Sequence, residues 1–323
     1  MKQRRFGEAS AQAASFTQPP PTNGEKMSAA VENNPADPKR QVFALVRRAD
    51  RLREQGSYAE SEKLFKQALA LAEETFGSEA PELTAVLNNH AILYKYSGQF
   101  DEAELLYRRA LDLAVRHLGE EHPEVATIYH NLGGLDHARG RFAEAEPAAR
   151  QAVEIRQLAL DADHPQVTET HLAADLAALA GVLDGQKKYE ESEPIYDRVL
   201  ELFERQLAAG DNSAEYEIAV NLNNLAALYT NTNRAEQAEP LYRRALALKE
   251  KLLGASHPDI ALSLNNLGVL LKKLGRREDA AEAYARALEI FEATLAADHP
   301  KLQAVRGNLE KLTLGTPAPS QAK

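Results

Sequence analysis

The sequence predicts an all-α fold, a right-handed α-solenoid built from stacked antiparallel helical hairpins. Two observations carry this prediction: an asparagine and a loop proline each recur about every 42 residues, and the two follow the same register. A fixed period of about 20 to 50 residues is typical of repeat proteins, in which each unit packs only on its neighbours. The asparagines, with one longer central gap of 93 residues, are Asn89, Asn131, Asn224, Asn266 and Asn308.

The prolines mark the places where one hairpin ends and the next begins. Between two of them lie two amphipathic segments, for example 87–96 and 103–118, whose apolar residues recur at the helical spacing i, i+3, i+4 and i+7. Proline suits the first turn of a helix because no backbone N–H is needed there. The prolines lie in Ala80-Pro81, His122-Pro123, His164-Pro165, His257-Pro258 and His299-Pro300.

Two repeats carry a recognisable motif. Segments 87–94 and 103–111 read LNNHAILY and AELLYRRAL, and segments 222–229 and 238–246 read LNNLAALY and AEPLYRRAL. These motifs resemble the tetratricopeptide repeats, and within them the 42-residue subclass of kinesin light chains. The signature of the shorter, commoner repeat is only partly kept, because its tryptophan position is occupied by Leu87, Tyr129, Leu222 and Leu264.

The repeats divide the chain into three parts. We expect a disordered N-terminal arm at 1–40, a solenoid at 41–315 and a disordered tail at 316–323, because the two ends are rich in Pro, Ala, Ser and Gln and cannot bury a core. The solenoid would hold six repeats and a capping helix at 303–314, forming one elongated core. Either Met1 or Met27 could be the true start.

The fourth repeat departs most from the pattern. It contains nine extra residues. Ala178, beside Ala177, occupies the position of the recurring asparagine, which we call the ladder position. The sequence leaves three interpretations open: a small apolar pocket, a bend that divides the solenoid into halves, or plain degeneration of one repeat.

Composition limits the compartment and the partners. The chain has no cysteine, which fits a reducing environment, and no apolar run approaches the roughly 18 residues that a membrane-spanning helix needs. Its net charge of −10 argues against binding to a phosphate backbone. We therefore expect a cytoplasmic protein with no nucleic-acid or membrane partner, and a monomer more readily than a homo-oligomer.

Catalytic motifs are missing from the sequence. Four of the nine histidines belong to the periodic His-Pro loops, and the chain has no HExxH, Gly-rich phosphate loop, GxSxG or cysteine nucleophile. His130 and His137 lie about 10 Å apart along one helix, too far for both to bind one metal ion. We expect no enzyme, no catalytic residue, no cofactor and no metal.

The candidate site is the predicted concave face formed by the first helix of each hairpin. An asparagine amide both donates and accepts, so a row of amides can hold the main chain of any extended peptide, and the resemblance implies this use. Basic residues beside the row favour an acidic peptide. The candidate residues are Asn88, Asn89, Asn131, Asn223, Asn224, Asn265, Asn266, Asn308, Arg47, Arg51, Lys95, Tyr96 and Lys273.

Two structural alternatives stay open for these residues. An asparagine within a helix costs roughly 0.5 kcal/mol relative to alanine, so its recurrence implies a partner group, which can equally be the adjoining repeat. The basic residues can equally form a solvated helix face, because Asp50 and Glu54 offset part of the charge of Arg47.

The sequence thus predicts a non-catalytic adaptor or scaffold that binds an extended protein segment, and the basic residues favour an acidic one. The first alternative is a self-assembling structural scaffold whose groove takes an end of a neighbouring copy. The second is a regulatory protein that senses a short peptide.

Overall fold

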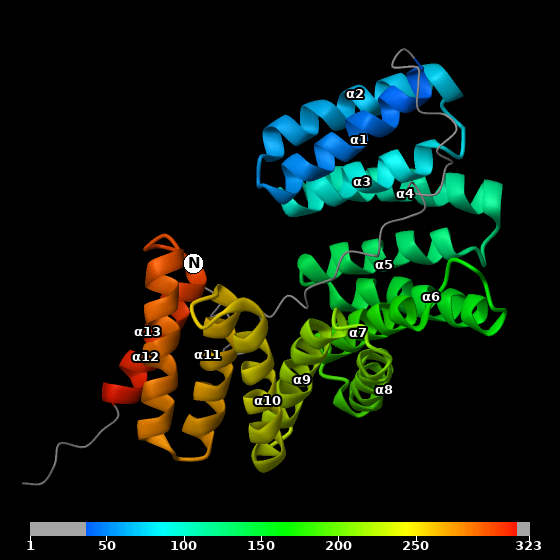
Figure 1. Cartoon of the computed structure of the whole chain (residues 1–323). Helices are drawn as coiled ribbons and strands as arrows, with labels where there is room; N and C mark the ends of the chain where they lie inside the picture. Colours follow the sequence, from blue (N-terminus) through cyan, green and yellow to red (C-terminus); the bar gives the residue numbers. More distant parts are fainter. Residues whose placement is uncertain (1–36, 315–323) are drawn as a thin grey trace, which may run out of the picture. The chain divides into compact units, whose positions relative to one another are not determined.

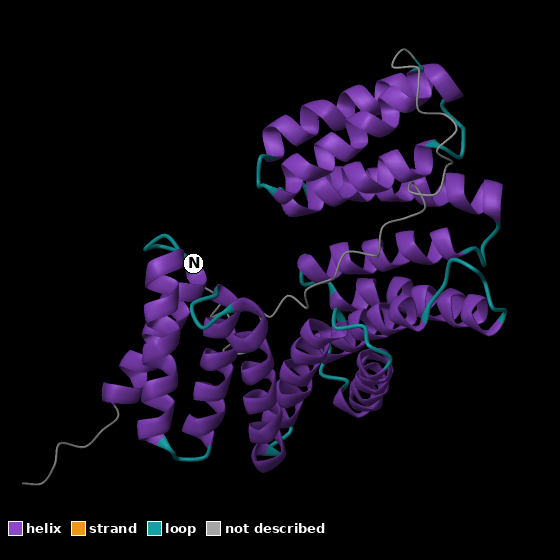
Figure 2. Cartoon of the chain, in the orientation of Figure 1, coloured by secondary structure: helices purple, strands orange, loops and turns teal. Residues whose placement is uncertain are grey.

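The computed structural model describes residues 37–314, with side chains to 312, and this range folds entirely into helices and their connections (Figures 1 and 2). The all-α repeat architecture is thereby confirmed. The helices are α1 (Pro38–Glu54), α2 (Tyr58–Phe76), α3 (Leu83–Tyr96), α4 (Phe100–Leu118), α5 (Pro123–Ala138), α6 (Phe142–Asp161), α7 (Glu169–Gly185), α8 (Tyr189–Ala208), α9 (Ala214–Asn231), α10 (Ala235–Leu253), α11 (Pro258–Lys273), α12 (Arg277–Thr294) and α13 (Pro300–Leu314).

The first and last helices each begin three residues earlier than the sequence led us to expect. Helix α1 begins at Pro38, because the Asp37 carboxylate accepts the backbone N–H of Lys39 at 3.0 Å and caps the helix. The capping helix α13 begins at Pro300, because its His-Pro pair starts a helix as the earlier pairs do. The remaining predicted arm, up to residue 36, and the predicted tail lie outside the described residues.

The chain divides into two compact units between Lys188 and Tyr189. Helices α1–α7 belong to the first unit and α8–α13 to the second. This differs from the single continuous core that we expected. The boundary falls between the two helices of the fourth repeat, the repeat with nine extra residues. A pocket or a bend in that repeat remains a prediction.

Five of the second helices place one large aromatic side chain in the core. These side chains are at most 2% exposed, and they are Phe65, Tyr107, Tyr196, Tyr242 and Tyr284. Gly268 makes room for the last of them, because a Cβ there would stand 2.7 Å from the Tyr284 ring. The third repeat has Ala149 instead, and α5 approaches it closely at Gly133.

Consecutive repeats are joined by a row of glutamates on the second helices, which we call the glutamate row. Each member accepts a hydrogen bond from a residue of the next repeat or forms an ion pair with it. Contacts in the first unit are Tyr94 to Glu62 at 3.2 Å, Arg139 to Glu104 at 2.6 Å and Lys188 to Glu146 at 2.6 Å. Those in the second unit are Arg234 to Glu193 at 2.7 Å and Arg276 to Glu239 at 2.9 Å. The Lys188 ammonium helps to lower the pKa of Glu146 to about 2.

A buried polar network fixes α7 to α5 and α6 in the first unit. One Asp175 carboxylate oxygen lies 2.8 Å from His130 Nδ1, and the other accepts from Arg156 Nε at 2.9 Å. Arg156 also donates to the Thr127 hydroxyl at 3.2 Å. Burial alone would raise the pKa of Asp175, but His130 and Arg156 hold it below its usual value. The carboxylate is therefore charged and held from two elements.

His90 is a second buried ionisable group. It is 3% exposed and stacks between Phe65 and Tyr94, with ring centroids 5.3 and 4.5 Å away. Neither ring nitrogen has a hydrogen-bond partner among the described residues. Burial lowers the pKa of His90 to about 4. The equivalent positions of other repeats hold leucine, at Leu132, Leu225, Leu267 and Leu309.

We predict that Asp175→Asn destabilises the first unit by about 3 kcal/mol, because the buried Arg156 guanidinium loses its carboxylate. Urea denaturation followed by circular dichroism measures the change. The matched control is Asp112→Asn on α4, whose carboxylate pairs with Arg116 at an exposed site and should change stability by less than about 0.5 kcal/mol. Equal effects of the two substitutions would contradict the role of the network.

We also predict that His90→Leu makes the protein more resistant to acid. The folded state holds His90 neutral, so its contribution is complete above the unfolded pKa of about 6.5 and is lost as the pH falls toward 4. The difference at pH 5 should be about 2 kcal/mol in favour of the leucine variant. Thermal unfolding of both proteins at pH 7.5 and pH 5 tests this, and an equal acid sensitivity of the two would refute it.

Candidate functional site

Four of the predicted asparagines form side-chain bonds between successive first helices. Asn131 Nδ2 on α5 donates to Asn88 Oδ1 on α3 at 2.8 Å, and both residues are buried. Asn308 Nδ2 on α13 donates to Asn265 Oδ1 on α11 at 3.0 Å. These amides therefore have partners inside the fold, as in the first structural alternative. Whether they also hold a peptide stays a prediction.

A third pair has the same spacing of 43 residues but no bond. Asn223 is 1% exposed, and its Oδ1 lacks a hydrogen-bond partner in the part of the chain that the structure describes, as does Nδ2 of Asn266. The two unsatisfied atoms are a complementary acceptor and donor. Asn224, beside them, is half-buried. We call each of these asparagine pairs a rung. Two rungs are closed by a hydrogen bond, and the third is open.

Asn89 lies where α3 contacts α1. Its Nδ2 donates to Asp50 Oδ2, and its Oδ1 accepts from Asn88, both at 3.4 Å, which is long for hydrogen bonds. Asn89 is half-buried. Burial raises the pKa of Asp50 and opposes the effect of Arg53. This amide is the most loosely held of the bonded asparagines.

The predicted basic residues differ in what they contact. Arg47 and Arg51 on α1 are exposed and make no ion pair with any residue between 37 and 314. Lys95 is half-buried, and burial lowers its pKa to about 8. Lys273 donates to the Thr230 carbonyl at 2.8 Å. Arg47, Arg51 and Lys273 are thus exposed, and of these three only Lys273 donates to another described residue.

Tyr96 completes a surface that we call the α1–α3 face, defined by Arg47, Arg51, Asn89 and Tyr96. The ring of Tyr96 is 50% exposed, and the Arg53 guanidinium carbon lies 5.5 Å from its centroid. Arg47 and Arg51 share one side of α1 because they are four residues apart. The face thus combines two free cations, an amide and an aromatic ring.

Three arginines on the second helices behave differently, because they pair with acids of the preceding repeat. The pairs are Arg109 with Glu73 at 2.7 Å, Arg244 with Glu204 at 2.8 Å and Arg286 with Glu250 at 2.5 Å. The free guanidinium groups of α1 are therefore not a general property of helix surfaces in this chain.

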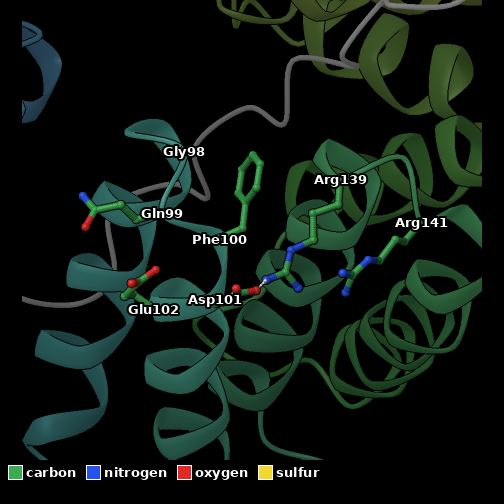
Figure 3. Close-up of a pocket in the computed structure, with 7 residues that line it drawn as sticks. All are labelled: Gly98, Gln99, Phe100, Asp101, Glu102, Arg139 and Arg141. Atoms are coloured by element: carbon green, nitrogen blue, oxygen red, sulfur yellow. Dashed lines mark hydrogen bonds and ion pairs between the residues drawn. The ribbon is translucent and has the colours of Figure 1, made fainter. Parts of the chain in front are cut away.

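An open recess of about 360 Å³ lies away from all the predicted residues, at the turns that end α3 and α5 (Figure 3). Its lining residues are Gly98, Gln99, Phe100, Asp101, Glu102, Arg139 and Arg141. Arg139 donates to Asp101 at 2.7 Å and to Glu104 at 2.6 Å. Because this guanidinium is held by carboxylates of the fold, the recess has little capacity to bind a charged ligand through it.

Metal sites and membrane-spanning helices are two further possibilities for the helical region, residues 37–314. That region contains no cluster of three or more His, Cys, Asp or Glu side chains arranged to hold a metal ion. Among its helices, none has the length and apolar character needed to cross a bilayer. His130 contacts Asp175 in the buried network, and within this region it forms no metal site with His137.

Comparison with family models matches the chain to the tetratricopeptide repeat over residues 41–116, 106–158 and 217–293, more than half of its length. A comparison with curated proteins found no match.

Several solved structures resemble the chain. BtubC (BKLC) from P. vanneervenii is 26% identical, with a TM-score of 0.51, over 81% of this chain and 94% of that one. NprR in complex with its cognate peptide NprX is 13% identical, with a TM-score of 0.55, over 86% and 74%. A putative kinesin light chain of Podosopora anserina is 21% identical, with a TM-score of 0.38, over 81% and 100%. The chain belongs to the tetratricopeptide repeat family, and its 42-residue repeats are of the kinesin-light-chain-like type.

Proposed function

We propose that this protein is a non-catalytic interaction adaptor that binds an extended, acidic segment of a partner protein. The observation that carries the proposal is that Arg47 and Arg51 on α1 are exposed and free of ion pairs among the described residues, on a helix whose neighbour α3 has a loosely held amide and an exposed tyrosine. Arginine and tyrosine are enriched at protein interfaces, where they supply much of the binding energy.

The charge of α1 favours an acidic partner. The whole chain has a net charge of −10, yet α1 contains six basic residues and only two acids, Asp50 and Glu54. A local positive surface on a negative protein attracts acidic segments and repels basic ones, and both effects increase selectivity. An acidic segment would replace the missing carboxylate partners of Arg47 and Arg51.

The asparagines would hold the main chain of the segment. Asn89 and Asn224 are half-buried, so their amides can form bonds to a peptide N–H or C=O. The bonded residues Asn88, Asn131, Asn265 and Asn308 each use only part of their hydrogen-bonding capacity in the rungs, and Lys95 and Lys273 would add charge. NprR, which has a similar fold, was solved with a bound peptide, and this supports peptide binding as the class of activity.

We predict that Arg47→Glu with Arg51→Glu weakens binding of acidic peptides at least tenfold, because two favourable charge contacts become repulsive. Peptides are selected from a displayed random library on the intact protein, and their affinities are measured by fluorescence anisotropy. The control Lys63→Glu with Arg205→Glu makes the same charge change on second helices and should preserve binding. Selection of peptides without an acidic bias, or equal losses in both variants, would overturn the proposal.

We further predict that asparagine variants separate into two groups. Asn89→Ala should weaken peptide binding several-fold with little loss of stability, because its bonds within the fold are long. Asn131→Ala should instead lower stability by about 1 kcal/mol, because it leaves Asn88 Oδ1 buried and unsatisfied. Thermal unfolding and anisotropy on both variants test this, and the reverse pattern would show that the closed rung is the binding site.

A further inference from the structure

Histidine side chains accept backbone N–H groups at the starts of first helices, and His164 does so in the turn that precedes α7. Nδ1 of His122 accepts the backbone N–H of Glu124 at 3.2 Å, and Nδ1 of His164 accepts that of Gln166 at 3.3 Å. Nδ1 of His171 accepts the N–H of Thr168 at 3.1 Å and closes a capping box at the start of α7. The His257 and His299 rings make the same bonds, at 3.2 Å each.

These bonds require a neutral imidazole. A ring nitrogen that accepts a backbone N–H must carry a lone pair, so the proton of the neutral ring lies on Nε2. Protonation puts a second N–H on Nδ1, directly opposite the backbone N–H. The cap then changes from an acceptor to a donor that repels the backbone N–H. At His171 the Nδ1 atom also lies 2.8 Å from the Thr168 hydroxyl oxygen, so protonation there exchanges the bond to the backbone for one to the hydroxyl. Serine, threonine, aspartate and asparagine, the usual capping residues, do not lose their acceptor in this way in mild acid.

Three of these histidines gather in the first unit, near the beginnings of α5 and α7. The rings of His122 and His164 meet edge to face, with centroids 5.8 Å apart. His122 is faced by Glu124 and His164, and His171 by Arg156 and Asp175. Burial, which is the largest effect on both, lowers the pKa of His122 and of His171. Protonation of two adjoining caps would also place two positive rings side by side.

We propose that His122, His164 and His171 form an acid-sensitive switch that releases the N-terminal turns of α5 and α7. The caps of His122 and His171 are complete above the unfolded pKa of about 6.5 and are lost as the pH falls through their lower folded values.

The same geometry disfavours a metal ion at the His122–His164 pair. Each Nδ1 is occupied by a backbone N–H, so Nε2 carries the proton and has no lone pair to give to a metal. Metal binding would therefore require the two caps to break first. The pair is therefore suited to respond to protonation and not to metal binding.

The first test is the position of the proton. Long-range ¹⁵N–¹H correlation spectra of the intact protein at pH 7.5 identify the tautomer of each histidine. We expect an unprotonated Nδ1 and a protonated Nε2 for His122, His164 and His171. A protonated Nδ1 at any two of these rings would overturn the proposal, whatever the stability of the variants.

The second test replaces the titratable caps with permanent ones. His122→Asn and His164→Asn keep a capping acceptor, and His171→Gln keeps the capping box. The triple variant should unfold at nearly the same temperature as the parent protein at pH 7.5. Between pH 7.5 and pH 5 its unfolding temperature should fall by about 5 °C less than that of the parent.

The control is His117→Gln, which changes an exposed histidine whose Nε2 contacts the Glu79 carbonyl and which caps no helix start. It should leave the acid response unchanged. A triple variant with the same acid response as the parent would refute the switch. Because His90 is retained in all these proteins, its own acid response does not affect the comparison.

Discussion

The bond between one hairpin and the next is the constraint on which the rest of this structure depends. A repeat stack has few contacts between distant parts of the chain, so every hairpin must be positioned by its neighbours. Here the glutamate row supplies a directed contact at successive junctions, for example from Arg139 to Glu104 and from Arg276 to Glu239. Each pair is partly exposed and is worth little alone. Together the pairs fix the register in which the apolar faces pack, and the apolar faces provide most of the stability.

The sequence predicted the fold because the period of 42 residues is carried by many positions at once. It predicted the partners of the asparagines less well. The amide of Asn131 bonds to Asn88, one position away from the ladder in the preceding repeat, and the choice between this partner and a bound peptide depends on side-chain directions that periodicity does not contain. The glutamate row is visible in the sequence as a recurring Ala-Glu or Ser-Glu pair, but the residues that donate to it vary among Arg139, Lys188 and Tyr94.

The fourth repeat illustrates a second limit. The nine extra residues and Ala178 indicated an irregular repeat, yet nothing in its spacing predicted that α7 would be held by a buried charge network. Asp175 pairs with His130 and Arg156, which come from two other helices. Such a network depends on three residues that are far apart in sequence and belong to no repeated pattern. Periodicity therefore cannot predict it. His90 is the opposite case, because the leucines at the equivalent positions identify it as an exception.

The asparagine rungs join helices within the fold, whereas the polar groups of the α1–α3 face lie at the surface. Where a first helix lies between two others, its polar side chains can find partners on both sides, and Asn88 and Asn131 do so. Helix α1 has a neighbouring first helix, α3, on one side only among the described residues. Within residues 37–314, Arg47 and Arg51 consequently have no repeat before them from which an acid could reach, whereas Arg109 pairs with Glu73 of the repeat before it. The same stacking rule that saturates the interior of a repeat array thus leaves charge unsatisfied at its first helix, and this is the physical reason to place a partner there.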